Sequence, residues 1–207
     1  EFCTSMAILK IPDSVTFIGA NSFSNCVAIM GTLIIPDSVK YIDQFAFSHC
    51  SSFTGLKIGS NLTEITPNAF EFCLNLASLT IPENIIHIGS YSFTSCTGIG
   101  GEIIIPDSVT RIDNHAFSNC INFTSLRIGK GLTEIGENVF ERCTSLQNIK
   151  LPETVKSIRS YAFYQCTGIV GTLTIPDSVA FLDKYAFYQC SGFTELNIGH
   201  RLTEINS

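Results

Sequence analysis

The nine cysteines stand at almost constant intervals along the 207-residue chain. The interval between successive cysteines, from Cys3 to Cys190, is always 23 or 24, and a Phe precedes each later Cys by three positions. A Pro or a Gly stands fourteen positions before each of those cysteines. A fixed period of roughly 20 to 50 residues indicates a solenoid, in which each unit buries its apolar face only against its neighbours.

Each unit is predicted to contain two short strands and a turn. An alternating segment such as Leu56-Lys57-Ile58 indicates a strand that ends at Pro or Gly. Pro-Asp-Ser then predicts a turn, in which Asp makes a local hydrogen bond. A second apolar pair follows, as at Val39 and Ile42, and the A-F-x-x-C segment has room for one helical or 3₁₀ turn. The sequence therefore predicts a β-rich solenoid with right-handed coils of about 23 residues and parallel sheets.

The sequence also contains a longer repeat, which spans three of these units. The phrases VAIMGTLIIPDSV, TGIGGEIIIPDSV and TGIVGTLTIPDSV directly follow Cys26, Cys96 and Cys166. The phrases FTGLKIGSNLTEI, FTSLRIGKGLTEI and FTELNIGHRLTEI recur at the same interval. The array is therefore interpreted as the product of duplicated three-repeat blocks.

The repeated phrases resemble those of BspA-like (treponemal-type) leucine-rich repeats. The phrase IPDSV occurs at residues 11–15, 35–39, 105–109 and 175–179. The resemblance covers residues 1–207 and implies a single leucine-rich repeat array of about nine repeats, curved, with a parallel sheet on its concave side. Similar proteins lie on the surfaces of bacteria and of parasitic or commensal protists, where adhesion to host protein is the role usually proposed. Pro after the strand departs from the general leucine-rich pattern, so a helix-rich convex side is not expected.

Composition excludes several classes of protein. With 45% hydrophobic and 14% charged residues, the chain is apolar enough to bury a core. No apolar stretch approaches the roughly 20 residues of a membrane-spanning helix, so we expect no membrane contact. The 12 basic and 18 acidic residues give a net charge of −6 without a basic cluster, which argues against a nucleic-acid partner.

The cysteine and phenylalanine columns are predicted to be structural. Cysteines in neighbouring coils would lie about 5 Å apart with parallel side chains, whereas a disulfide needs Cβ atoms turned toward each other. Zinc sites use closely spaced ligands, whereas each Cys here is separated from the next by a whole repeat unit. We therefore expect reduced, buried thiols, a stack of Phe rings, and no metal or cofactor.

No residues form a recognisable active site, and the chain is not expected to be an enzyme. His49, His87, His115 and His200 fall in different columns, and no Ser or Cys is paired with one as an activated nucleophile. A row of acidic residues follows the Pro column and is interpreted as turn-forming and solubilising, with weak cation attraction as the alternative. These residues are Asp13, Asp37, Glu83, Asp107, Glu153 and Asp177.

The outward position of the first strand is the leading candidate for binding protein. This first-strand column mixes basic and apolar residues on an acidic protein, although strands favour long and β-branched side chains anyway. Its members are Lys10, Ile34, Lys57, Thr80, Ile104, Arg127, Lys150, Thr174 and Asn197.

An aromatic patch near the C-terminal end is the alternative binding site. Tyr is favoured at interfaces because it offers a large contact area and a polar tip, but tyrosines in neighbouring coils could equally stack on one another. The patch comprises Tyr161, Tyr164, Phe181, Tyr185 and Tyr188.

Two sequons begin at Asn61 and Asn122. Asn61 lies in a column whose polar side chains are expected to bond turn backbone, whereas Asn122 is expected to lie in an open loop. If a eukaryote secretes the protein, Asn122 is therefore the expected glycan acceptor.

Three functions are consistent with these features. The first is a non-catalytic cell-surface or secreted adhesin segment that binds a host cell-surface or extracellular-matrix protein. The others are an intracellular protein-interaction scaffold and a structural spacer in a larger surface protein. Neither end reads as a polar capping unit, so we expect the chain to be an excerpt of a longer array.

Overall fold

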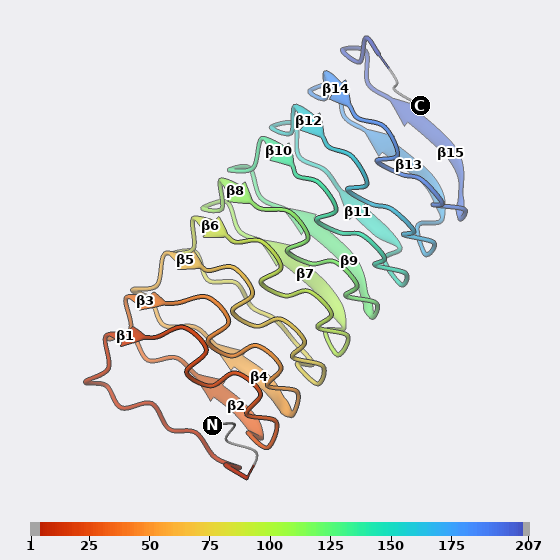
Figure 1. Ribbon diagram of the computed structural model, residues 1–207. Helices are drawn as coiled ribbons and strands as arrows, with labels where there is room; N and C mark the ends of the chain where they lie inside the picture. The colour runs from red at the N-terminus through yellow and green to blue at the C-terminus, as the bar shows by residue number, and fades with distance from the viewer. Residues whose placement is uncertain (1–4, 205–207) are drawn as a thin grey trace.

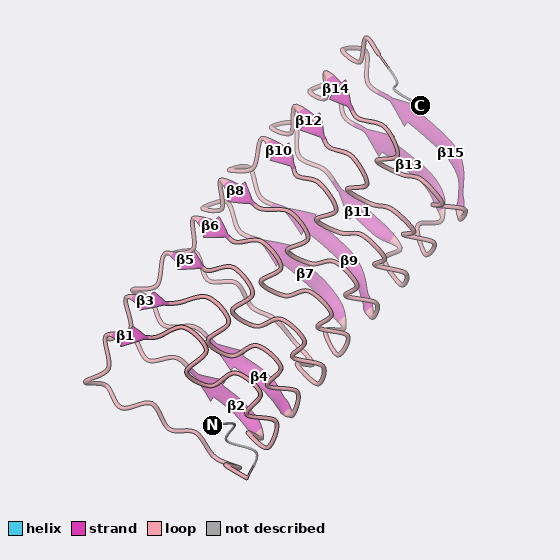
Figure 2. Ribbon diagram, viewed as in Figure 1, coloured by secondary structure: helices cyan, strands magenta, loops and turns pink. Residues whose placement is uncertain are grey.

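The computed structural model describes residues 5–204, which form one continuous stack of coils along a single axis (Figure 1). Parallel strands follow one another along the stack in two rows, and every pairing between the strands of residues 5–204 is parallel. Figure 2 shows strands and loops but no helix in this part of the chain. The β-solenoid expected from the sequence is confirmed.

The first row of strands carries the alternating segments, and we call it the first sheet. Strand β2 pairs with β4, β9 lies between β7 and β11, and β13 pairs with β15. Leu33 and Leu56 pair in register and are both buried, while Ile34 and Lys57 pair beside them and are exposed. The strands are β2 (Gly31–Ile34), β4 (Phe53–Lys57), β7 (Gly101–Ile105), β9 (Phe123–Ile128), β11 (Asn148–Lys150), β13 (Gly171–Ile175) and β15 (Phe193–Ile198).

The second row consists of two-residue strands, and we call it the second sheet. In each of these strands the second residue, an Ile or a Leu, is buried. The strands are β1 (Phe17–Ile18), β3 (Tyr41–Ile42), β5 (Glu64–Ile65), β6 (His87–Ile88), β8 (Arg111–Ile112), β10 (Glu134–Ile135), β12 (Ser157–Ile158) and β14 (Phe181–Leu182). The two sheets therefore enclose the core between them.

Glycine accounts for the coils that are slightly longer than the others. Gly31, Gly101 and Gly171 have φ of 74°, 72° and 71°, a region that glycine adopts without steric cost. The register of the first sheet shifts immediately after each of them. The longer cysteine interval thus corresponds to a local irregularity that leaves the rest of the coil in register.

The A-F-x-x-C segment does not form the helical or 3₁₀ turn expected from the sequence. Phe45 and His49 have φ of 59° and 60°, in the left-handed region, which a right-handed helix excludes. Backbone N–H groups of this segment donate alternately to the same coil and to the next coil. The Ser48 N–H donates to Phe45 O within the coil at 3.1 Å, and the Phe47 N–H donates to Ala69 O of the next coil at 2.9 Å. The segment therefore makes consecutive turns that also join neighbouring coils.

Three aspartates after Pro, Asp37, Asp107 and Asp177, bond to the next coil rather than locally, contrary to the sequence expectation. Asp37 Oδ1 accepts a hydrogen bond from the Ser60 N–H at 2.7 Å, and Asp107 Oδ1 accepts one from the Lys130 N–H at 2.7 Å. The next coil approaches closely here because Gly replaces Pro: a Cβ on Gly129 would lie 2.5 Å from the carbonyl carbon of Pro106. These carboxylates therefore fasten one coil to the next.

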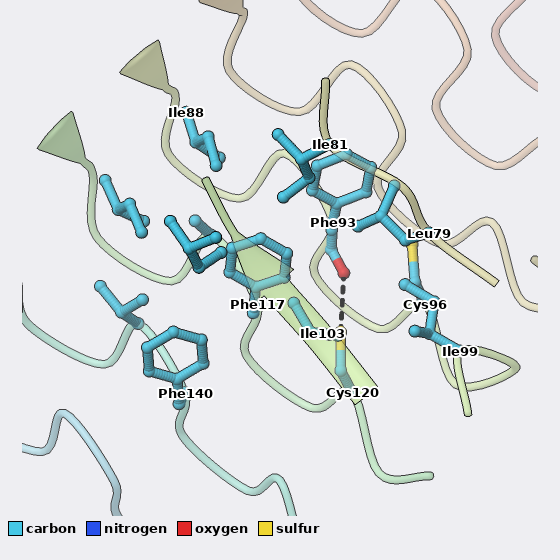
Figure 3. Close-up of a cluster of buried hydrophobic side chains, with 14 of the residues drawn as sticks. Leu79, Ile81, Ile88, Phe93, Cys96, Ile99, Ile103, Phe117, Cys120 and Phe140 are labelled. Atoms are coloured by element: carbon cyan, nitrogen blue, oxygen red, sulfur yellow. Dashed lines mark hydrogen bonds between the residues drawn. The ribbon is translucent and has the colours of Figure 1, made fainter. Parts of the chain in front are cut away.

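The Phe column forms a continuous stack in the core, as predicted. Centroids of successive rings from Phe23 to Phe187 are 5.1–5.6 Å apart, with planes within 15° of parallel. A bond that the sequence did not reveal accompanies the stack: Cys120 Sγ donates to the carbonyl oxygen of Phe93 at 3.1 Å (Figure 3). The equivalent bond recurs from Cys50 to Cys190, so each described thiol in that range has an acceptor.

Candidate functional site

The first-strand column is exposed along its whole length. Ile34 is 52% exposed and Ile104 is 41% exposed, although large apolar residues usually prefer burial. Strand pairing sets Ile34 beside Lys57, and Arg127 between Ile104 and Lys150. Thr174 and Asn197 pair in the same way, while Lys10 and Thr80 are exposed outside the named strands. The structure thus brings the predicted column into one surface line.

Two equivalent hollows, three coils apart, lie beside this column, and the sequence did not predict them. The larger has a volume of about 660 Å³, with Ile104, Arg127 and Lys150 on the strand side. Turn residues complete its lining, among them Asp107 and Glu153, each of which follows a Pro. Three coils earlier, a hollow of about 420 Å³ is lined by Ile34 and by the turn residues that correspond in the repeat, including Asp37. Residues that repeat along the sequence therefore also repeat as a surface shape.

The charges of this face are only partly compensated. Arg127 Nε lies 4.0 Å from Glu102 Oε1, at the limit of an ion pair. Lys57 and Lys150 make no ion pair with any residue between 5 and 204. The hydrogen bond from the Ser60 backbone lowers the pKa of Asp37, and the charge of Lys57 lowers it further. The face therefore presents cations beside carboxylates that bond to the next coil.

The four tyrosines of the aromatic patch contact one another. Tyr161 stacks on Tyr185 at 5.1 Å between centroids, and Tyr164 stacks on Tyr188 at 5.8 Å. Within each coil the two rings meet edge to face, at 5.5 and 5.4 Å. Phe181 instead lies on β14, beneath the Arg159 guanidinium at 5.2 Å. The stacking between coils that we considered from the sequence is thus present.

A histidine bridged by two carboxylates was not predicted. His87 Nδ1 lies 3.0 Å from Glu64 Oε1, and His87 Nε2 lies 2.9 Å from Asp113 Oδ2. Arg111 Nε adds an ion pair to Asp113 at 2.6 Å. Because Glu64 and His87 are one repeat period apart, the sequence could have predicted that these two side chains meet. It could not have predicted Asp113, which lies in a different column of the repeat. The cluster links three coils of the second sheet.

One serine and one histidine of the described residues lie within hydrogen-bonding distance of each other. Ser48 Oγ lies 2.8 Å from His49 Nδ1, but Ser48 is only 2% exposed. A nucleophile must reach its substrate, and this hydroxyl is buried beneath the surface.

Within residues 5–204 no cluster of three or more His, Cys, Asp or Glu could hold a metal ion. The same residues include no helix long and apolar enough to span a membrane.

Both sequon asparagines lie at the surface. The side-chain nitrogen of Asn61 donates to Asp37 O, and that of Asn122 donates to Thr97 O, each at 2.7 Å. The polar contact expected at Asn61 is therefore present, but Asn122 makes an equivalent one instead of lying in an open loop. The preference for a glycan at Asn122 stays a prediction.

The chain belongs to the BspA-type leucine-rich repeat family. The profile of the BspA type leucine rich repeat region matches residues 1–100 and 100–207, with six copies of the repeat. This match defines the class of protein as a leucine-rich repeat solenoid, a fold that typically serves as a protein-interaction scaffold. No curated protein matches the chain.

Solved structures of bacterial leucine-rich repeat proteins are similar to this chain. The T. pallidum leucine-rich repeat protein is 25% identical with a TM-score of 0.67, over 92% of this chain and 72% of that one. A Bacteroides ovatus leucine-rich repeat protein is 19% identical with a TM-score of 0.61, over 93% and 79%. A leucine-rich cell surface protein of Faecalibacterium prausnitzii is 21% identical with a TM-score of 0.58, over 95% and 81%.

Proposed function

We propose that this chain is a non-catalytic, protein-binding segment of a cell-surface adhesin that contacts a host or extracellular-matrix protein. One observation carries the proposal: the first-strand column forms an exposed line in which Ile34 and Ile104 stand beside cations. Exposed apolar residues that recur on a surface favour an interaction site, because water solvates them poorly.

The shape of this face supports a protein partner rather than a small ligand. The residues are spread over many coils, so binding energy would come from several weak contacts along the axis. The hollows beside Ile34 and Ile104 would accept side chains of the partner. Lys57, Arg127 and Lys150 would attract an acidic partner and accelerate its association.

A location at the cell surface rests on resemblance. The F. prausnitzii relative is described as a cell surface protein, and it has the same fold.

The test is a combined Ile34→Ser, Ile104→Ser and Arg127→Ser variant in a cell- and matrix-adhesion assay. A matched control changes exposed Ile86 and Lys156 of other columns to Ser. We expect the first variant to lose about tenfold or more in affinity, because exposed anchors and cations carry most interface energy. The control should bind as the parent does.

Circular dichroism would verify that both variants fold. Equal adhesion by the parent and the triple variant would contradict the proposed face. Absence of adhesion by the parent itself would favour a structural spacer.

A further inference from the structure

Two positions in every described coil hold the backbone in the left-handed region, five residues and one residue before Cys. Asn tolerates this region better than other residues with a Cβ, and Asn21, Asn68 and Asn138 occupy the first of these positions. Larger side chains also occur at this first position in other coils, as at Phe45, Tyr91 and His115. The last two described coils place Tyr161 and Tyr185 at the first position and Gln165 and Gln189 at the second, with φ of 57–60°. Among the described coils, these two alone combine Tyr at the first position with Gln at the second.

The tyrosine patch, formed by Tyr161, Tyr164, Tyr185 and Tyr188, leaves ring surface and hydroxyl groups accessible. Stacked rings in van der Waals contact have planes about 3.5 Å apart, so the larger centroid separations mean that the rings are displaced and incompletely covered. Tyr185 is 40% exposed and Tyr188 is 49% exposed. None of the four hydroxyl groups forms a hydrogen bond with another residue of the described chain.

A directed chain of hydrogen bonds ends at Gln189, the residue after Tyr188. Arg142 Nε donates to Gln165 Oε1 at 2.8 Å, and Gln165 Nε2 donates to Gln189 Oε1 at 2.6 Å. These bonds fix which way both amides face. The side-chain nitrogen of Gln189 is left without an acceptor among residues 5–204, at an exposed position next to Tyr188. The patch therefore combines aromatic carbon, hydroxyl groups and a free amide donor without a net charge.

We infer that the tyrosine patch, together with Gln165 and Gln189, is a binding site for a neutral oligosaccharide. A sugar ring has C–H groups that pack on aromatic rings, and its hydroxyl groups both donate and accept hydrogen bonds, as Tyr and Gln do. A proline-rich segment is the competing ligand, but it docks between aromatic side chains. Here each ring already contacts a neighbouring ring, which occupies that space. The site is separate from the first-strand column and does not depend on its function.

The test titrates the full chain with neutral oligomers of glucose, mannose, galactose and N-acetylglucosamine, and with decaproline. The chain has no Trp, and four of its six Tyr form the patch, so intrinsic tyrosine fluorescence reports mainly on the patch. We expect at least one of the oligosaccharides to bind and decaproline not to bind. The double variant Tyr161→Asn/Tyr185→Asn should weaken that binding about tenfold or more, because it removes two contact rings.

Matched variants separate binding from folding. The double variant introduces Asn, and Asn138 shows that Asn adopts the left-handed backbone conformation of this column. The melting temperature of the variant should therefore not fall. Tyr91→Asn makes the same change in the same column outside the patch and should leave binding unchanged. If the double variant does not fold, Tyr164→Phe/Tyr188→Phe decides the question, because it removes two hydroxyl groups and keeps the rings.

Three results would overturn the inference. They are failure of every oligosaccharide to bind at millimolar concentration, unchanged binding by a folded patch variant, and binding of decaproline in place of the sugars.

Discussion

At the scale of single residues, the Phe column supplies large buried surfaces, and Phe117 lies at its middle. Its ring is fully buried and stacks on Phe93 at 5.4 Å and on Phe140 at 5.6 Å. Phe117→Ala should lower the free energy of unfolding by about 3–5 kcal/mol, the usual cost of removing a buried Phe. Urea denaturation checks this, with exposed Phe17→Ala as the control. Equal midpoints for Phe117→Ala and the parent would contradict the packing described.

The thiols should be unreactive in the folded protein. Burial raises the pKa of Cys50 to about 12, and it also raises the pKa of Cys120. Only thiolates are alkylated rapidly. At pH 8, iodoacetamide should leave the eight described cysteines of the native protein unmodified.

Denaturation without a reductant should then expose nine reactive thiols to intact-mass measurement. Cys3, which lies outside the described residues, completes that number. Fewer than nine modified cysteines would instead indicate disulfides.

At the scale of the coil, glycine permits the close approach of one turn to the next. A Cβ at Gly129 would lie 2.5 Å from the carbonyl carbon and oxygen of Pro106, whereas a Cβ at Gly100 would meet nothing within 4 Å. Gly129→Ala should therefore destabilise the protein by about 1–3 kcal/mol, as overpacking does. Gly100→Ala is the matched control for thermal denaturation. A Gly129→Ala protein as stable as Gly100→Ala would argue against this contact between coils.

The Asp37 bond to the next coil predicts a dependence of stability on pH. The Ser60 hydrogen bond lowers the pKa of Asp37 in the folded state, so the unfolded state binds its proton more readily. The contribution of Asp37 to stability is then complete above its ordinary pKa of about 3.9 and is lost as the pH falls through the lower folded value.

We therefore expect Asp37→Asn to lower the melting temperature at pH 7 and to differ less from the parent near pH 3. Asp13→Asn, in the same column without this bond, is the control. A difference between Asp37→Asn and the parent that is constant with pH would contradict the role of the charge.

The periodic elements could be predicted from the sequence, because residues one period apart meet in neighbouring coils. That argument placed the Phe rings, the thiols and the first-strand column. It could not place Asp113 beside His87, since the two residues belong to different columns. It also missed the left-handed turns, because Phe45 gives no sign of positive φ. Asn21 and Asn25, in the same two columns, were the available signal.

At the scale of the whole molecule, the core is more continuous than the sheets. Between β4 and β7 the first sheet is reduced to one bridge, Gly55 to Ser78, and no strand pairing joins β11 to β13 in the described part of the chain. The Phe stack nevertheless runs through both places without interruption. Side-chain packing therefore keeps the first-strand column in line where strand pairing is weakest.

The central claim is that residues one repeat apart in the sequence lie at regular intervals along one face of the stack. The distance between Ile34 and Thr174 tests this claim most directly. These residues occupy the same column six coils apart. Genetically encoded spin labels at the two positions should give a single narrow distance of about 29 Å by double electron–electron resonance, because parallel strands are spaced about 4.8 Å apart. A broad distribution, or a distance far from this value, would contradict the stacked solenoid and the binding face derived from it.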